Sequence, residues 1–202
     1  MIPRRAILLA AAERLRAETK GLIYVSGRGG GTGSARAQTL HALRATGLKP
    51  KDILSTTAYL TDPKHLPDVD LGYRDFFGKE FPARTELIAG PRTPGGLVEI
   101  SAVGSKSGGR RLIQPAFPAS AAAEAAGTLY LSAVRGGGET VGKQTERLMT
   151  NQNAVLAAAG FSFSDLVLSK IYLAEPAGYA ALNEVYERFV TAPPPARATI
   201  HA

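Results

Sequence analysis

The chain has 202 residues, of which 45% are hydrophobic, and it contains no cysteine. This length provides for two modest hydrophobic cores, and the missing cysteine excludes disulfides, thiol nucleophiles and cysteine metal sites. The formal net charge of +7 comes from scattered basic residues with a tight cluster at Arg110 and Arg111, which indicates a solvated basic surface and disfavours nucleic acid as a partner. No stretch has the pattern of a signal peptide or a membrane span, so we expect a soluble cytoplasmic protein.

Strands and helices alternate along the chain in an order that is typical of an α+β fold. The first half predicts a strand at 22–26, a helix at 35–45, a strand at 53–60, a helix at 66–77 and strands at 85–89 and 97–103. The second half predicts a strand at 128–132, a helix at 145–159, a strand at 166–173, a helix at 179–190 and a strand at 198–202. We expect two lobes, each a mixed sheet with two helices packed on one face.

The second half repeats the first. Without a gap, Pro82-Ala83-Arg84 superposes on Pro195-Ala196-Arg197, and the same shift also matches Leu43 with Leu156, Gly47 with Gly160, Tyr73 with Tyr186 and Phe76 with Phe189. This pattern predicts a tandem duplication. Matched apolar residues and glycines serve cores and turns, whereas a matched arginine does not, so Arg84 and Arg197 are the first functional candidates.

The glycine- and serine-rich run at 104–109 has the composition of a linker. We therefore expect one lobe at 1–104, a linker at 105–109 and a second lobe at 110–202. The counterpart of the strand at 97–103 falls beyond the last residue of the sequence. The second lobe is thus expected to lack its last strand, either because the lobe is incomplete or because the sequence is a fragment.

Several familiar motifs fail on inspection. The glycine-rich run at 27–33 follows a strand and precedes a helix, but it has no Lys-Ser/Thr at phosphate-loop spacing, and the dinucleotide pattern breaks at Thr32. A flexible turn is the favoured interpretation. His41, His65 and His201 have no ligand spacing, and there is no Gly-x-Ser-x-Gly elbow. We therefore expect neither a metal nor a serine hydrolase site.

A candidate pair remains on two strands that we expect to be adjacent. Arg84 opens one strand, and Glu99 lies on the next, where alternation places Val98, Ile100 and Ala102 on one face and Glu99 with Ser101 on the other. A carboxylate within an apolar strand is costly unless it has a partner. The residues alone leave two interpretations open, an ordinary cross-strand ion pair and a functional site.

Two segments decide between these interpretations. Phe-Pro-Ala-Arg-Thr at 81–85, followed by Gly-Gly-Leu-Val-Glu-Ile-Ser-Ala-Val at 95–103, resembles the carboxy-terminal signature of the RidA (YjgF) family of reactive-imine deaminases. Further similar segments lie at 22–27, 56–62, 182–189 and 194–199. The resemblance implies a chorismate-mutase-like α+β fold that forms trimers around a β-barrel, with ligand clefts between subunits.

The resemblance also implies roles for individual residues. Arg84 is expected to hold a substrate carboxylate and Glu99 to position the attacking water, while Ser26 and Gly27 line the cleft. The matching residues of the second copy, which we expect to contact substrate, are Arg197, Ser132 and Asn183.

The sequence departs from the family pattern at several positions. Glu13 and Ala119 stand where a cleft tyrosine is expected, Asp70 stands where the asparagine is expected, and Ala133 replaces the glycine in the second copy. The second copy has no glutamate that corresponds to Glu99. These departures put in doubt whether both lobes are active.

The function expected from this resemblance is hydrolysis of small 2-imino or 2-enamino acids to 2-oxo acids and ammonium, without metal or organic cofactor. Two alternatives remain, a biosynthetic enzyme that acts on another carboxylate-bearing intermediate, as chorismatases do, and a non-catalytic binder of small carboxylates. A homotrimer is the favoured assembly. In the other arrangement considered, the two lobes of one chain imitate two adjacent subunits.

Overall fold

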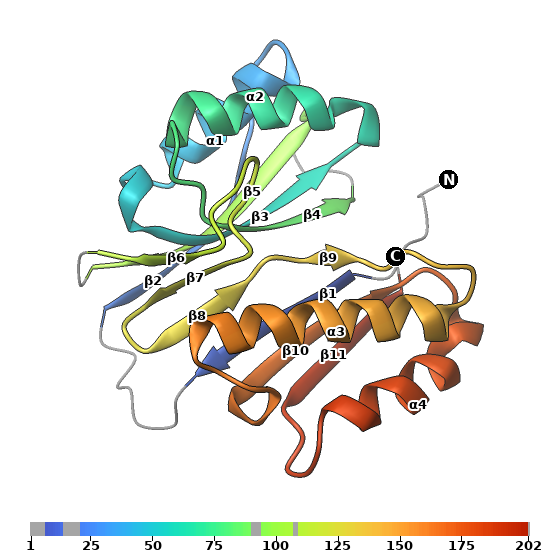
Figure 1. Ribbon diagram of the computed structural model, residues 1–202. Coiled ribbons are helices and arrows are strands. Elements are labelled where there is room, and N and C mark those ends of the chain that lie inside the picture. Colours follow the sequence, from blue (N-terminus) through green and yellow to red (C-terminus); the bar gives the residue numbers. More distant parts are fainter. Residues whose placement is uncertain (1–6, 14–20, 90–93, 107–108, 202) are drawn as a thin grey trace.

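The computed structural model describes residues 7–13, 21–89, 94–106 and 109–201, with the backbone alone for 7–13. It shows a mixed α+β fold with two β-sheets in the middle and two α-helices on the outer side of each sheet (Figure 1). Among these residues, no helix is long and apolar enough to cross a membrane.

The four-stranded sheet is built from the first half of the chain. Its strands lie in the order β2 (Leu22–Gly29), β5 (Val98–Ser105), β3 (Ile53–Leu60) and β4 (Ala83–Ile88), and its helices are α1 (Ala35–Ala45) and α2 (Leu66–Phe77). β3 pairs in parallel with β4 and antiparallel with β5. The predicted bounds of both helices and of β3 are confirmed. β4 and β5 were expected to be adjacent, but β3 lies between them, because a parallel β3–β4 connection through α2 leaves the other side of β3 for β5.

The seven-stranded sheet contains six strands of the second half and β1. Its strands lie in the order β11 (Ala196–His201), β10 (Leu166–Leu173), β1 (Ile7–Glu13), β8 (Thr128–Leu131), β7 (Ala122–Ala125) and β6 (Arg111–Ile113), and β9 (Val134–Arg135) pairs with β1. Its helices are α3 (Val141–Ala159) and α4 (Tyr179–Phe189). The prediction missed β6, β7 and β9 because they are short, and β7 consists of alanine and glutamate, which rarely mark a strand. Residue 202, the last residue of the predicted final strand, lies outside the described residues.

Short 3₁₀ turns precede four of these elements. They lie at Pro50–Asp52, Pro63–His65, Phe163–Asp165 and Pro176–Gly178. The first and third lead into strands β3 and β10, and the second and fourth lead into helices α2 and α4. The same kind of connection therefore occurs at matching places in the two halves.

Strand β1 was not expected, and it takes the place of the strand that the second half lacks. β1 lies between β8 and β10, just as β5 lies between β2 and β3. The Cα of Ile7 pairs with Tyr172, as Glu99 pairs with Tyr59 in the other sheet. Without β1, two central strands would present rows of unpaired backbone N–H and C=O groups. Residues 7–13 therefore join the second sheet instead of the lobe at 1–104 that the sequence predicted.

Each sheet packs its helices on a separate apolar core. On the first sheet, fully buried Leu43, Tyr73 and Ile100 meet at the centre. On the second sheet, Leu129, Met149 and Leu156 are among the central buried residues. The amphipathic helix patterns that predicted these cores are confirmed.

The segment that joins the two halves is fixed by the basic cluster. Arg110 donates hydrogen bonds to the carbonyl oxygens of Pro50, Ile53 and Glu80, and burial lowers its pKa. Arg111 donates to Glu124 and to the carbonyl oxygen of Ala159, 2.7 Å away. β5 continues to Ser105, so the predicted linker begins inside a strand. Residues 107 and 108 of that linker lie outside the described residues.

Candidate functional site

Arg84 lies on the helix-covered face of the first sheet. Its side chain is almost fully buried, and the guanidinium carbon lies 4.2 Å from the centre of the Tyr73 ring. The Tyr73 hydroxyl donates to Thr56 Oγ1 at 2.9 Å. Burial raises the pKa of Tyr73, although the positive charge of Arg84 opposes that shift. β4 and α2 together therefore hold the arginine flat against an aromatic ring.

Two carboxylates accompany Arg84. Its Nη2 lies 2.7 Å from Asp70 Oδ1 and 2.6 Å from Glu86 Oε1. These short distances give a strong electrostatic contact, yet within the described part of the chain none of the three guanidinium nitrogens has a hydrogen bond of good geometry. Nη2 is therefore paired in charge with both carboxylates, whereas Nε and Nη1 have no hydrogen bond among the described residues. Arg84 is thus compensated in charge but keeps donors for another acceptor.

Arg84 also connects the two halves of the chain. Its backbone N–H donates to Ser132 Oγ at 2.9 Å, and its carbonyl oxygen accepts from the Ala133 N–H at 3.0 Å. Ser132 Oγ in turn donates to the Ser120 carbonyl oxygen at 2.6 Å. The hydroxyl of Ser132 and the N–H of Ala133, both near the predicted cleft, are therefore engaged in structural bonds.

A small pocket of about 100 Å³ opens beside these bonds. It is lined by Arg84, Glu86, Ala119, Ser132, Ala133 and Arg135. Ala119 stands where the resemblance led us to expect a cleft tyrosine, and a second cation, Arg135, lies 3.3 Å from Glu86. The pocket therefore joins residues of both halves around Arg84, and its charges are balanced by Glu86 and Asp70.

Glu99 lies on the opposite face of the same sheet. Arg84 pairs with Thr56 of β3, whereas Glu99 pairs with Tyr59, and residues three apart on a strand point to opposite faces. The predicted alternation is confirmed, since Val98, Ile100 and Ala102 are buried under the helices. The expected single pair of Arg84 and Glu99 is not formed, because β3 and the sheet itself separate them.

Glu99 instead lies against Gly27. A Cβ atom at Gly27 would fall 1.9 Å from Glu99 Oε1, so only glycine leaves room for this carboxylate. Ser26 and Gly27 are both exposed on β2, and Glu99 is half-buried on β5. The structure thus brings three predicted residues together, without either of the two predicted arginines.

Arg197 repeats the surroundings of Arg84 with one difference. Its guanidinium carbon lies 5.0 Å from the centre of the Tyr186 ring, and the Tyr186 and Ser169 hydroxyls are hydrogen-bonded at 3.1 Å, as Tyr73 and Thr56 are. The residues that match Asp70 and Glu86 are the neutral Asn183 and Thr199. Among the described residues Arg197 has no carboxylate partner, and it is exposed.

The other neighbours of Arg197 are polar. Its Nη2 donates to the Tyr179 hydroxyl at 3.0 Å. A hydrogen bond with Asn183 and the charge of Arg197 lower the pKa of Tyr179. Asn183 Oδ1 is buried without a partner among the described residues. Arg197, Tyr179 and Asn183 therefore form a polar cluster that carries a net positive charge.

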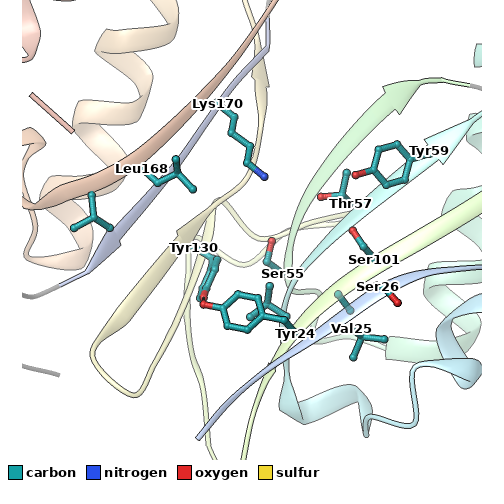
Figure 2. A pocket seen from close by; sticks show the side chains of 13 residues that line it. Tyr24, Val25, Ser26, Ser55, Thr57, Tyr59, Ser101, Tyr130, Leu168 and Lys170 are labelled. Carbon is teal, nitrogen blue, oxygen red and sulfur yellow. The ribbon is translucent and has the colours of Figure 1, made fainter. Parts of the chain in front are cut away.

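A larger cavity of about 510 Å³ lies between the two sheets (Figure 2). Side chains of β2, β3 and β5 line one wall, and those of β8 and β10 line the other. Among its described lining residues, Ser26 alone was a predicted site residue. The cavity itself was not predicted, although the alternation of Ser55, Thr57 and Tyr59 along β3 is a signal that could have indicated a polar inner face. Lys170, which faces these residues, had no signal in the sequence because its position depends on the packing of the sheets.

The described residues contain no group of three or more histidine or acidic side chains that could hold a metal ion. The side chains at the sites above supply guanidinium, ammonium, carboxylate and hydroxyl groups.

Comparisons with known proteins relate this chain to one family. The family model described as Endoribonuclease L-PSP matches residues 113–202. The 2-iminobutanoate/2-iminopropanoate deaminase of Dermatophagoides farinae is 33% identical over 95 residues, which are 43% of this chain and 74% of that protein. Protein DfrA of Myxococcus xanthus is 51% identical over 57 residues, which are 28% of this chain and 44% of that protein.

Two further relatives belong to the same group. Reactive Intermediate Deaminase A, chloroplastic, of Arabidopsis thaliana is 39% identical over 61 residues, 30% of this chain and 33% of that protein. The crystal structure of a YjgF/YER057c/UK114 family member from Mycobacterium tuberculosis has 29% identity and a TM-score of 0.39 over 44% of this chain and 81% of that one. The chain spans about half or less of the length of most of the curated relatives that it matches.

Proposed function

The chain belongs to the RidA/YjgF family, and we propose that it hydrolyses small 2-imino or 2-enamino acids to 2-oxo acids and ammonium. In this reaction water adds to the carbon of the C=N bond, and the C–N bond of the resulting carbinolamine then breaks to release ammonia. The deaminase name of the Dermatophagoides farinae relative supports this substrate class. The reaction needs a carboxylate anchor and a group that orients water.

We also propose that the chain arose by tandem duplication. The observation that supports both proposals most directly is a repeated trio, Arg84 with Tyr73 and Thr56 in the first half and Arg197 with its counterparts Tyr186 and Ser169 in the second. A core does not require an arginine stacked on a hydrogen-bonded tyrosine at two matching places. A guanidinium group held flat in this way presents its fork of N–H groups to a carboxylate.

The two arginines differ in their readiness to bind an anion. Arg84 has buried N–H donors without hydrogen-bond partners, but Asp70 and Glu86 already neutralise its charge. Arg197 has no carboxylate beside it among the described residues. We propose that either arginine can hold the substrate carboxylate and that Arg197, whose charge is uncompensated, binds it more tightly.

Glu99 is the proposed group that positions the water. Its carboxylate fills the space above Gly27, where it can accept a hydrogen bond from a water that approaches the imine carbon. Exposed Ser26 supplies a hydroxyl beside the same place. Because Arg84 points to the other side of the sheet, the arginine of this site has to come from another lobe.

The contact between the two halves suggests how that arginine is supplied. Within the chain, Arg84 of the first half meets Ser132 of the second half. The repeat gives Arg197 and Ser26 the equivalent positions, and these two have no mutual contact among the described residues. Such a head-to-tail contact joins two different surfaces, one around Arg84 and the other around Ser132. The equivalent surfaces around Arg197 and Ser26 are left for contact with other copies of the chain. We propose that Arg197 of one chain faces Ser26, Gly27 and Glu99 of another chain in a homotrimer.

One observation favours a second function. Residues of the second half have no counterpart of Glu99, since Ile7 holds that register position. A binder of small carboxylates needs the arginine alone, so non-catalytic carboxylate binding remains the alternative. A reaction on another carboxylate-bearing intermediate is also an alternative, because the arginine would hold that carboxylate in the same way.

The experiment that tests the function supplies a 2-imino acid in situ from an amino-acid oxidase and measures the rate of 2-oxo acid formation. We expect the protein to accelerate this step and Glu99→Gln to lower kcat with little change in KM, because glutamine keeps the shape but loses the basic carboxylate. Glu146→Gln, on an exposed face of α3, is the matched control. Equal loss of kcat and affinity in Glu99→Gln would point to a packing role, and binding of 2-oxo acids without any turnover would support the binder.

A further inference from the structure

The cavity between the two sheets is distinct from the arginine sites. The arginines lie on the outer, helix-covered faces, whereas this cavity lies between the inner faces of the sheets. At one end, the hydroxyls of Tyr24 and Tyr130 approach to 3.3 Å and join the two walls. At the other end, buried Leu87 and Tyr172 pack together with Tyr59. The space of about 510 Å³ between these contacts has the size of a small-molecule site.

Lys170 is the single charged residue among the described side chains that line this cavity. It lies on β10, it is half-buried, and among the described residues it has no ion pair. Figure 2 shows its Nζ directed into the space between the sheets. A partly buried ammonium without a counter-ion is costly, and an anion in the cavity would offset that cost.

The opposite wall offers hydroxyl groups to the same space. Ser55 and Thr57 of β3 and Ser101 of β5 line it, and none of the three side chains has a hydrogen bond to another described residue. Thr57 is the repeat counterpart of Lys170, so equivalent positions of the two halves face each other across the cavity. The arrangement provides one cation and several neutral donors, which suits the two oxygens of a carboxylate.

The rest of the lining is apolar or aromatic. It consists of Val25, Ala102, Val103, Val167, Leu168, Tyr59 at one end and the rings of Tyr24 and Tyr130 at the other, together with the polar Ser26. A small inorganic anion would leave this surface uncovered, whereas an apolar or aromatic group would bury it. The walls therefore fit an organic monoanion that has a carboxylate and an apolar or aromatic group.

We propose that the inter-sheet cavity is a second ligand site, which binds a small carboxylate with an apolar or aromatic body through Lys170 and the hydroxyls of the facing wall. This site does not depend on imine hydrolysis. It uses neither Arg84 nor Arg197, and it is present within a single chain.

Isothermal titration with phenylacetate tests the proposal, and phenylacetamide of the same shape serves as the uncharged control. We expect phenylacetate to bind at one site per chain and Lys170→Met to weaken it by at least about tenfold, because a charge-assisted contact is lost. Lys170→Arg is expected to keep most of the binding. Lys51→Met, which removes an exposed lysine elsewhere, is expected to leave binding unchanged.

Thermal unfolding and a second variant test the same proposal independently. Without ligand, Lys170→Met is expected to raise the midpoint of thermal unfolding, because it removes an uncompensated, half-buried charge. If Lys170→Met fails to fold, Thr57→Val with Ser101→Ala takes its place, and we again expect weaker phenylacetate binding. Binding that is lost in Arg197→Lys but kept in Lys170→Met would assign phenylacetate to the arginine site and overturn the proposal.

Two more outcomes would overturn it. Equal binding of phenylacetate and phenylacetamide would mean that Lys170 does not recognise charge. A change in the mass of the assembly on Lys170→Met, without any change in phenylacetate binding, would show that another copy of the chain covers the cavity.

Discussion

Arg84 and Glu99 lie on opposite faces of the four-stranded sheet, with β3 between their strands. A single ligand cannot contact both side chains of one lobe. The backbone N–H of Arg84 donates to Ser132 of the second half, and both residues line the same small pocket. A site that contains both an arginine and Glu99 therefore has to take these two side chains from different lobes.

The ion-pair network of Arg84 should contribute to stability. We expect Arg84→Met to lower the free energy of unfolding by about 3 kcal/mol, because it leaves the partly buried carboxylates of Asp70 and Glu86 without a cation. Urea denaturation measures this change. The triple variant with Asp70→Asn and Glu86→Gln should recover part of the loss. If the triple variant were no more stable than Arg84→Met, loss of the stacking on Tyr73 would be the cause.

Gly27 should tolerate a side chain only when Glu99 is shortened. A Cβ at Gly27 would overlap Glu99 Oε1, so we expect Gly27→Ala to displace the carboxylate and to lower turnover by about tenfold or more. The double variant with Glu99→Ala removes the overlap and should unfold at the same denaturant concentration as Glu99→Ala alone. A double-mutant cycle of stability measures this coupling, and strictly additive effects would contradict it.

Tyr179 should ionise at a lower pH than an ordinary tyrosine. Its hydrogen bond with Asn183 and the nearby charge of Arg197 favour the phenolate, which lowers its pKa. Asn183→Ala and Arg197→Gln should each raise that pKa. Ultraviolet titration of the protein, read as the difference from Tyr179→Phe, isolates this group from the other tyrosines. Titration curves that are the same with and without Arg197 would exclude the electrostatic contact in solution.

The assembly should have the mass of three chains. Light scattering coupled to size exclusion is expected to give about 64 kDa, three times the 21.2 kDa of the chain, because the open Arg197 and Ser26 surfaces need other copies to cover them. Arg197→Glu should lower this mass, whereas Arg147→Glu on the exposed face of α3 should not. A single species of chain mass at micromolar concentration would contradict both the trimer and the shared site.

The sequence by itself determined much of the fold and the family. Apolar periodicity located the four helices, the four strands of the first sheet and strands β8, β10 and β11, because each of these elements buries one face and therefore carries a regular pattern. Ser26, Gly27 and the repeated arginine are residues that the sequence singled out and that the structure places at distinctive positions. Such signals are local, so one sequence is sufficient to read them.

The tertiary structure decided which of these residues meet. Strand order separated Arg84 from Glu99, and the packing of the two halves joined Arg84 to Ser132. The same packing placed Lys170 opposite Thr57 across a cavity. The place of β1 in the second sheet was equally invisible, because strand pairing is set by backbone hydrogen bonds between distant segments, and such pairing leaves no local pattern in the amino-acid sequence.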